Sequence, residues 1–378
     1  MQQQTSQPLV DSLSPSTTPT PGAALGHAPD LVVANENALT GSAIGAANPE
    51  PALRGIVWAL NTGEAGMRSQ ARGLAAATGL TVVEKIVDVT PWLTWLPGNM
   101  VPAPLTSLTR GSDPLTSPWP DVVVSCGRRT TSLSIAIKRA SLGRTINVHV
   151  QHPLCKPRAF DLIVSMRHDG LEAPNVLNVD TAMHGVTAEK LNDGRAQWGP
   201  KFANLKRPLI GVILGGRNRS YRFTLERAAE LINGLQRIRA ATGAGIAITP
   251  SRRTEPDVVA FITEQFRQAP NTFVWDMTGD NPYFGILGLA DRLVVTSDSV
   301  SMISEALATG LPVETFDLDG RARRHEMFVD NLICQDMVQP FTGEPEPPQA
   351  HAPLDATRTA ADAIVELLRQ RRAANGWA

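Results

Sequence analysis

The sequence predicts an α/β fold with two domains, each built on a parallel sheet, behind a disordered N-terminal segment. Its 378 residues are enough for two domains and some additional segments. Short apolar runs alternate with helical patterns in two separate series along the chain. Such alternation is typical of parallel strands whose sheet is covered by helices on both faces.

Residues 1–50 form the segment that we expect to be disordered. Small and polar residue types dominate it, and it has few charges and no sustained periodicity. Such a segment cannot bury enough apolar surface to offset the entropy lost on ordering. It also lacks the basic and apolar regions of a secretory signal, and no stretch of the chain approaches the roughly 20 apolar residues of a membrane span. We therefore expect a cytoplasmic protein.

The first series of strands and helices predicts an N-terminal domain over residues 51–200. Helical spacing of Ala and Leu predicts a helix at Arg68–Thr78, and a second helix is predicted at Ser132–Arg139. Residues 195–207 break the pattern and are predicted to be a connector between the domains. Apolar runs bounded by turn residues predict strands at Ile56–Leu60, Thr81–Val87, Asp121–Cys126, Ile146–Val150 and Leu162–Ser165.

The same rhythm restarts and predicts a C-terminal domain over residues 207–345. A further helix over residues 355–374 is expected, by analogy with other two-domain proteins, to cross back to the first domain. Open parallel sheets bind ligands at the carboxyl ends of their strands. We therefore expect two Rossmann-like domains that face a cleft holding two substrates. The predicted strands of this domain are Leu209–Leu214, Ile246–Thr249, Thr272–Asp276, Leu293–Thr296 and Pro312–Phe316, and the helices are Thr224–Ala241, Pro256–Gln268, Tyr283–Ala290 and Ser299–Thr309.

Composition excludes several functional classes. Lys and Arg total 35 and Asp and Glu total 36, and the resulting net charge of -1 gives no general attraction to nucleic acid. Aromatic residues make up 5% of the chain, too few for base-stacking platforms. The three cysteines are widely spaced and no side-chain cluster has metal-ligand spacing. We therefore expect no metal site and no cofactor.

The most informative stretch runs from the predicted strand Leu293–Thr296 into a helix. Ser297, Asp298 and Ser299 form the turn between them, and Ser299 is a good N-cap. Exposed backbone N–H groups and the positive end of the helix dipole make such a turn a ready anion site. Glu305, further along the helix, can accept hydrogen bonds from a ribose. The alternative is that the three turn residues only cap a helix.

Other loops of the second domain add candidates for donor binding. Gly215 and Gly216 would let the backbone approach a ligand closely. Arg252 and Arg253 would clamp a diphosphate with their guanidinium groups. Asn281 opens a loop that would wall the base pocket. Each also has a plain structural interpretation, as a turn, as a helix cap beside two surface charges, or as a packing loop, and the residues alone leave these alternatives open.

Acceptor-side candidates follow two strand ends of the first domain. Gly63 and Gly66, with Gln70 one turn inside the next helix, suit the close approach of a substrate. Gly127 and Arg128 repeat the pattern at a later strand end. The glycine spacing does not match the dinucleotide fingerprint, so a standard dinucleotide site is not expected.

Two residues of the first domain are candidates for acid–base catalysis. His152 lies in a loop after a strand, and a histidine titrates near neutral pH, which suits deprotonating a hydroxyl acceptor. Glu64 is the candidate carboxylate. A lone histidine in a loop is more often structural, and both interpretations stay open.

Several of these motifs together resemble a known family. They are Ser125-Cys126-Gly127-Arg128-Arg129, Val148-His149-Val150-Gln151, Phe160-Asp161-Leu162-Ile163-Val164, His168-Asp169, Thr249-Pro250-Ser251-Arg252-Arg253-Thr254, Asn281-Pro282-Tyr283 and the run Val295 to Ala306. The resemblance is to the mitochondrial fission "elongated mitochondria" family, whose bacterial members are described as glycosyltransferases or, loosely, as nucleoside-diphosphate-sugar epimerases. It covers residues 55–345, and the run around Ser297 to Glu305 is its most specific part.

The family is similar to the two-domain glycosyltransferase design called GT-B, which has implications for the site. The resemblance implies that the turn Ser297–Ser299 and Glu305 form the donor-binding turn and helix of that design. It also implies that Arg252 and Arg253 lie near the diphosphate. The chain departs from the family at His152, where an acidic residue is expected before the proline.

Three hypotheses for function follow. The first is a metal-independent GT-B-type glycosyltransferase that binds a nucleotide-sugar in the interdomain cleft and acts on an unidentified acceptor in cell-envelope or glycoconjugate synthesis; a lipid-linked acceptor would give it a peripheral membrane association. The second is a nucleoside-diphosphate-sugar epimerase on the same fold, with Glu64 and Asp298 as candidate carboxylates. The third is a non-catalytic adaptor, since the resemblance implies that plant members act in organelle division by recruiting a dynamin-like partner.

Overall fold

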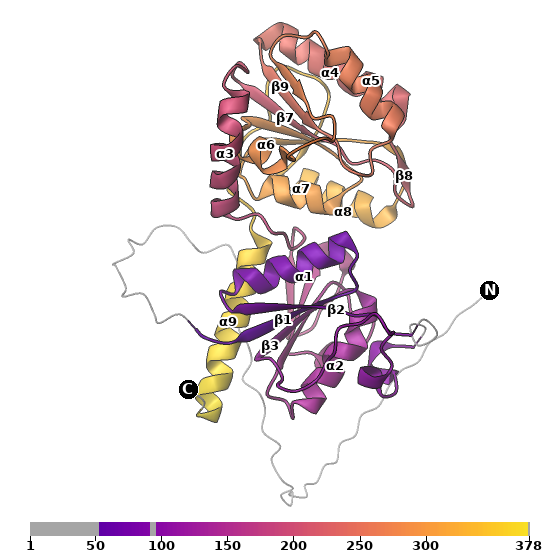
Figure 1. Cartoon of the computed structure of the whole chain (residues 1–378), viewed down its shortest axis with the longest axis vertical. Helices are drawn as coiled ribbons and strands as arrows, with labels where there is room; N and C mark the ends of the chain where they lie inside the picture. Colours follow the sequence, from indigo (N-terminus) through magenta and orange to yellow (C-terminus); the bar gives the residue numbers. More distant parts are fainter. Residues whose placement is uncertain (1–52, 91–95, 377–378) are drawn as a thin grey trace, which may run out of the picture. The chain divides into compact units, whose positions relative to one another are not determined.

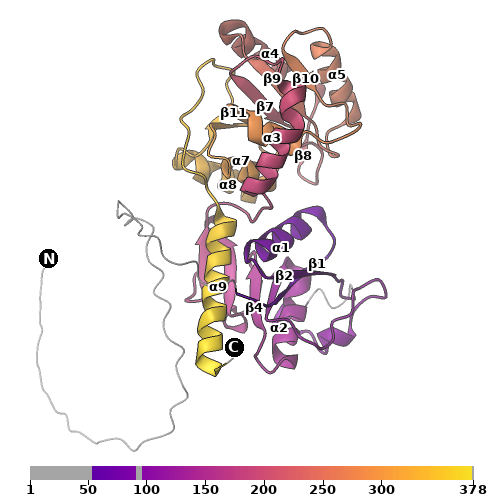
Figure 2. The same cartoon turned by 60° about the vertical axis from the view of Figure 1, so that its left-hand side comes forward.

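The computed structural model describes residues 53–90 and 96–376, and within these it contains two six-stranded parallel sheets (Figures 1 and 2). The predicted α/β class with two Rossmann-like domains is confirmed. The predicted disorder of residues 1–50 lies outside the described residues. Within the described ranges, no helix is both long and apolar enough to cross a membrane.

The first sheet has the strand order β2-β1-β3-β4-β5-β6, and every neighbouring pair is parallel. Its central strands β3 and β4 are buried along their whole length, as expected for apolar strands covered on both faces. β6 was not predicted, because four residues with an Asn among them give too short an apolar run. The strands are β1 (Ile56–Asn61), β2 (Thr81–Ile86), β3 (Val122–Cys126), β4 (Ile146–Val150), β5 (Leu162–Met166) and β6 (Val176–Val179).

Helices cover both faces of the first sheet. Val122 and Val124 pack on the same side as α1 (Ala65–Ala77), whereas Val123 packs with α2 (Thr131–Ala140) on the other side. This division follows from the two-residue period of a strand. Short 3-10 helices complete the loops of the domain at Gly98–Met100, Pro104–Thr106, Arg128–Thr130, Pro157–Ala159 and Arg167–Asp169.

The last helix, α9 (Ala356–Asn375), belongs to the core of the first sheet, although the chain reaches it from the second domain. Its buried residues Ala360, Ala361, Ile364 and Leu368 join the apolar cluster formed by β1, β3 and α1. Figures 1 and 2 show α9 running beside α1 and the strands of this sheet. The end of the chain therefore stabilises the first domain.

The second sheet has the strand order β10-β9-β7-β11-β12-β14, again with every neighbouring pair parallel. β7 is the first of these strands along the chain, so the order is that of a doubly wound Rossmann sheet whose winding reverses between β7 and β11. A separate antiparallel pair joins β8 (Tyr221–Arg222) to β13 (Asp319–Gly320). The strands of the sheet are β7 (Leu209–Ile213), β9 (Gly245–Thr249), β10 (Thr272–Val274), β11 (Arg292–Thr296), β12 (Val313–Phe316) and β14 (Gln339–Pro340).

Alternate residues of β11 show which helices cover which face of the second sheet. Val294 packs with α4 (Leu225–Thr242) and α5 (Pro256–Phe266). Leu293 and Val295 pack with the helices of the other face. Those helices are α6 (Tyr283–Leu289), α7 (Val300–Leu307) and α8 (Arg323–Cys334).

The predicted connector at residues 195–207 is wrong, because α3 (Ala188–Phe202) occupies most of it. Gly199 and Pro200 lie within this stretch and are poor helix formers. In the structure Gly194 allows close packing, since a Cβ there would lie 2.5 Å from the backbone oxygen of Phe284 in α6. Trp198 joins the core of the second sheet. α3 therefore packs with the second sheet, although the sequence assigned residues up to 200 to the first domain.

The packing of α9 gives a first prediction. Ile364→Ala should lower the free energy of unfolding by about 2–5 kcal/mol, because it leaves a cavity in the core of the first sheet. Gln370→Ala, on the exposed face of the same helix, should change it by less than about 0.5 kcal/mol. Urea denaturation of both variants measures the difference, and equal stabilities would show that α9 is not part of this core.

His149 in β4 is a fully buried titratable group of the first domain. Its Nδ1 lies 2.9 Å from the hydroxyl oxygen of Ser125, and its ring centroid is 5.2 Å from that of Phe160. Burial lowers the pKa of His149 from 6.5 to about 3. The ring is therefore neutral at pH 7.

This shift predicts a pH dependence of stability. Between pH 6.5 and about 3 the unfolded chain protonates His149 and the folded chain does not, so the free energy of unfolding should fall as the pH falls through this window. Above the window both forms are neutral and the effect vanishes. His149→Leu should reduce the slope by up to about 1.4 kcal/mol per pH unit. Denaturation curves at several pH values measure the slope, and an unchanged slope in the variant would assign the effect to other groups.

Candidate functional site

Three loops meet at the carboxyl edge of the second sheet, where its winding reverses. β7 and β11 lie side by side there, with Ile213 opposite Val295. The loops that follow them contain Gly215–Gly216 and Ser297–Ser299. The third loop, residues 250–254, follows β9, the other neighbour of β7. Reversal points of this kind are where doubly wound sheets bind ligands.

Asp298 joins these three loops. Its side chain is completely shielded from solvent. Arg253 Nη1 donates to Oδ2 at 2.7 Å, the Thr296 hydroxyl donates to Oδ1 at 2.7 Å, and the backbone N–H of Gly216 donates to Oδ2 at 3.3 Å. A buried carboxylate is stable only when it is paired and hydrogen-bonded. The structure therefore places Asp298 as a link between loops rather than as a free group.

Gly215 and Gly216 make room for this link. A Cβ on Gly215 would lie 2.1 Å from Asp298 Oδ1, and a Cβ on Gly216 would lie 2.2 Å from the backbone oxygen of Arg253. Gly216 also has a φ of +149°. From the sequence we expected these glycines to let a ligand approach, whereas in the structure it is a neighbouring loop that approaches.

The turn after β11 leads directly into α7 and leaves hydrogen-bond donors unused. The Ser299 hydroxyl accepts from the backbone N–H of Met302 at 3.4 Å, so Ser299 is the N-cap. Within the part of the chain that the structure describes, the backbone N–H groups of Val300 and Ser301 have no acceptor. Unused N–H groups at the positive end of a helix dipole favour an anion.

The two arginines of the 250–254 loop have different environments. The Arg253 guanidinium is half-buried and paired with Asp298. The Arg252 side chain is exposed, and no residue of the described chain forms an ion pair with it. Hydrogen bonds from the backbone N–H of Ser251 to the Thr254 hydroxyl, at 2.9 Å, and from that hydroxyl to the Gly215 carbonyl hold the loop in place. Arg252 is therefore the cation of this loop that is free to bind a ligand.

Glu305 lies further along α7 and is half-buried. The Tyr283 hydroxyl donates a hydrogen bond to its Oε2. Burial raises the pKa of Glu305, against the lowering effects of this hydrogen bond and of the nearby Lys190 charge. Burial and the neighbouring Glu305 charge raise the pKa of Tyr283. Asn281 supports this pair indirectly, because its Oδ1 accepts from the backbone N–H of Tyr283 at 2.9 Å.

His325 belongs to this site and was missed from the sequence. It lies on α8, and its ring centroid is 5.7 Å from that of Tyr221 on β8. Burial and the charge of Arg253 lower the pKa of His325, whereas Asp298 and a hydrogen bond to the Asp298 backbone raise it; the net direction is downward. No local signal predicted α8, since its first turn is charged and resembles a solvated loop.

The acceptor-side candidates lie at the corresponding position of the first sheet, where the winding reverses between β1 and β3. Gly63 has a φ of +82°, and its N–H donates to Asn61 Oδ1 at 2.8 Å. Gly127 has a φ of +86°, and a Cβ there would lie 3.0 Å from the sulfur of Met67. Gln70 is buried and its Oε1 lies 3.4 Å from Gln151 Nε2. The remaining acceptor-side candidates are Gly66 and Arg128. Gly66 lies in the first turn of α1, and Arg128 is exposed.

Among the described residues, no hydrogen bond or ion pair joins the two acid–base candidates, Glu64 and His152. The Glu64 carboxylate pairs with Arg129, which also donates to Asp88. His152 Nδ1 accepts from the backbone N–H of Leu154 at 3.0 Å. A neutral ring in this state carries its proton on Nε2 and faces a ligand as a donor. A role for His152 as a base would require this contact to break.

A family model described as Mitochondrial fission ELM1 matches residues 65–368. The chain is 30% identical over 283 residues to the "Mitochondrial fission protein ELM1" of Arabidopsis thaliana, which covers 68% of this chain and 65% of that protein. It is 25% identical over 259 residues to the "Uncharacterized protein RP120" of Rickettsia prowazekii, and the match covers 59% of this chain and 72% of that protein. The matched region thus spans just under two thirds of the plant protein.

Two solved structures are similar at a lower level. The UDP-GlcNAc 2-epimerase of Methanocaldococcus jannaschii is 13% identical, with 84% of this chain and 100% of that chain covered and a TM-score of 0.49. The MurG protein of Acinetobacter baumannii is also 13% identical, with 83% and 99% covered and a TM-score of 0.46. Likeness at this level says nothing about substrate, and the fold assignment depends on the strand order of the two sheets.

The close packing at Gly215 can be tested by its effect on stability. Gly215→Ala should lower the free energy of unfolding by about 1–3 kcal/mol, because the added carbon would displace Asp298 from its partners. Gly199→Ala, in α3, is the matched control. A Cβ at Gly199 meets nothing within 4 Å, so the change should be neutral or stabilise by about 0.5–1 kcal/mol. Urea denaturation measures the free energy of unfolding of both variants. Similar values would contradict the close contact between Gly215 and Asp298.

Proposed function

The chain belongs to the mitochondrial fission ELM1 family, and for this member of the family we propose binding of a nucleotide-sugar in the second domain, as in a GT-B-type glycosyltransferase. One observation carries the proposal. At the reversal point of the second sheet, the unused N–H groups at the start of α7 lie on the same edge as the loop of the unpaired Arg252. An anion with two or more phosphate groups matches this pair of features.

The diphosphate is proposed to bind at the first turn of α7. The N–H groups of Val300 and Ser301 supply neutral donors, and the helix dipole adds a partial positive charge. Arg252 supplies a full positive charge from a loop that is held by its own hydrogen bonds. Arg253 contributes through Asp298, whose position it fixes.

The ribose is proposed to bind at Glu305. Ser301 and Glu305 are four residues apart in α7 and so share one face of the helix. Glu305 lies about 6 Å further along the axis than Ser301, at about 1.5 Å per residue. Tyr283 occupies Oε2, while Oε1 has no donor among the described residues and can accept from a hydroxyl. A nucleoside diphosphate that lies along α7 would use both ends of this helix.

The chemistry of this arrangement suits departure of a diphosphate. Preorganised donors stabilise the charge that develops on a leaving group without reorganisation, and the α7 N–H groups and Arg252 are such donors. The acceptor is proposed to enter from the first domain, near Gly63 and Gly127. The epimerase alternative is less well supported, because Asp298 is held by Arg253 and Glu64 pairs with Arg129.

A thermal-shift panel tests the binding site. UDP, ADP, GDP, CDP and dTDP, with their common sugar conjugates, are added at millimolar concentration to the full chain. A ligand that binds only the folded protein raises the melting temperature. Arg252→Ala should weaken binding of the stabilising nucleotide by about tenfold, since a hydrogen bond to a charged group is lost. Glu305→Ala should weaken binding of the nucleotide but not of pyrophosphate, which has no ribose.

Arg267→Ala is the matched control, because Arg267 lies at the far end of the helix that follows the Arg252 loop. It should leave the melting temperature shift unchanged. No shift with any nucleotide would refute the proposal, and normal shifts in both site variants would place the binding site elsewhere. If a nucleotide-sugar binds, release of the free nucleoside diphosphate indicates transfer of the sugar. Inversion of the sugar at C2 indicates epimerisation. If neither occurs, the protein acts as an adaptor.

A further inference from the structure

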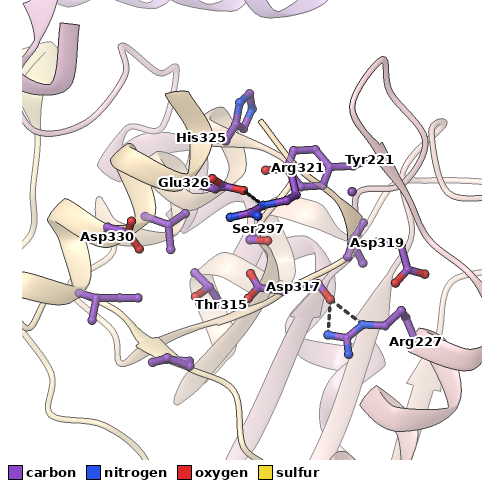
Figure 3. Close-up of a pocket in the computed structure, with 15 residues that line it drawn as sticks. Tyr221, Arg227, Ser297, Thr315, Asp317, Asp319, Arg321, His325, Glu326 and Asp330 are labelled. Carbon is purple, nitrogen blue, oxygen red and sulfur yellow. Dashed lines mark hydrogen bonds and ion pairs between the residues drawn. The ribbon is translucent and has the colours of Figure 1, made fainter. Parts of the chain in front are cut away.

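A cavity of about 550 Å³ opens beside the proposed diphosphate site (Figure 3). It lies at the carboxyl ends of β11 and β12, where Ser297 and Thr315 line it. α8 and the β8–β13 pair form other parts of its wall, through His325 and Tyr221 among others. Ser297 is also the first residue of the turn that leads into α7. The cavity therefore begins where the proposed diphosphate site ends, and it has the size of a small-molecule site.

Two hydroxyl groups in this cavity lack partners. Ser297 is 5% exposed and Thr315 is 4% exposed. Neither hydroxyl forms a hydrogen bond with any residue of the described chain, and Figure 3 shows both side chains at the cavity. They come from adjacent strands, since β11 and β12 pair with Val295 opposite Thr315. Two unpaired hydroxyls that face one cavity are available to donate hydrogen bonds to a polar ligand or accept them from it.

Acidic side chains line much of the remaining wall. The wall contains two guanidinium groups, those of Arg227 and Arg321. It contains four carboxylates, those of Asp317, Asp319, Glu326 and Asp330. Arg321 is occupied by Glu326, at 2.9 Å. Arg227 is occupied by Glu230 and by the backbone oxygen of Asp317, so the Asp317 carboxylate has no ion pair among the described residues. The cavity thus offers acceptors and hydroxyls rather than a site for another anion.

We propose that this cavity holds the sugar of the nucleotide-sugar and selects a neutral or amino sugar over a uronic acid. The inference rests on the proposed function, because it takes the diphosphate to lie at the start of α7. With the ribose toward Glu305, the opposite end of the diphosphate is directed toward Ser297. A sugar there would donate its hydroxyls to the carboxylates and to Thr315. A sugar carboxylate would instead face Asp317 and Asp319, and like charges brought together disfavour binding.

Sugar phosphates test the cavity independently of the base. Dissociation constants of the full chain for glucose 1-phosphate, glucuronic acid 1-phosphate and inorganic phosphate are measured by calorimetry at low ionic strength, where charge effects are least screened. We expect glucose 1-phosphate to bind about tenfold more tightly than either of the others, a change of about 1.4 kcal/mol. Asp317→Asn should reduce the difference between the dissociation constants for glucose 1-phosphate and glucuronic acid 1-phosphate.

Thr315→Val keeps the shape of the side chain and removes the hydroxyl. This substitution should weaken the binding of glucose 1-phosphate about tenfold and leave the affinity for inorganic phosphate unchanged. Thr272→Val is the matched control, because Thr272 begins β10 at the opposite edge of the sheet and its hydroxyl donates to the Ala269 carbonyl. This control should leave the affinity for both compounds unchanged.

The outcomes separate the two proposals. If nucleoside diphosphates bind but glucose 1-phosphate binds no better than phosphate or glucuronic acid 1-phosphate, the cavity assignment is overturned and the diphosphate site stands. If Thr315→Val and Thr272→Val behave alike, the sugar does not contact Thr315 and the assignment is likewise overturned. If neither nucleotides nor sugar phosphates bind, both proposals are wrong.

Discussion

The buried carboxylate of Asp298 holds the candidate site together. β7 and β11 end side by side at the reversal point of the second sheet, and the loops after them have to turn away without separating. A carboxylate sealed from solvent is costly unless its charge is matched, so Asp298 fixes the position of Arg253 as well as that of its own turn. Gly215 follows from the same constraint, because a side chain there would occupy the space of the carboxylate. Asp298 thus joins the loops that follow β7, β9 and β11.

The reversal points of the two sheets use charge in different ways. In the first sheet, Glu64, Arg129 and Asp88 form an ion-pair network whose members are all partly exposed, with 61% of the Glu64 side chain accessible. Exposed pairs of this kind stabilise a protein little and rearrange easily. In the second sheet, the pair of Asp298 and Arg253 has one fully buried member. The ion pair at the second reversal point is therefore the better shielded from solvent of the two.

Much of the fold could be predicted from the sequence because buried parallel strands require continuous apolar runs, and β3, β7 and β11 all show them. The N-cap at Ser299 was also predictable, since it depends on a hydroxyl directly before a helix. α3 was not, because Gly199 and Pro200 are poor helix formers and resemble a break in the pattern. His325 was missed for a similar reason, as nothing local shows that α8 brings it to the Asp298 backbone. Contacts between distant loops leave no periodic signal.

Several unused polar groups of the second domain lie at the carboxyl edge of its sheet. The groups that hold the loops, such as Asp298 and Thr296, satisfy one another. The groups at this edge that have no partner among the described residues include the first N–H groups of α7, the Arg252 guanidinium and the hydroxyls of Ser297 and Thr315. This division separates the residues that hold the loops in place from the groups that are proposed to bind the ligand. Arg252 and Arg253 show this difference, although they are adjacent residues of the same type. Arg253 holds Asp298, whereas Arg252 is proposed to bind the ligand.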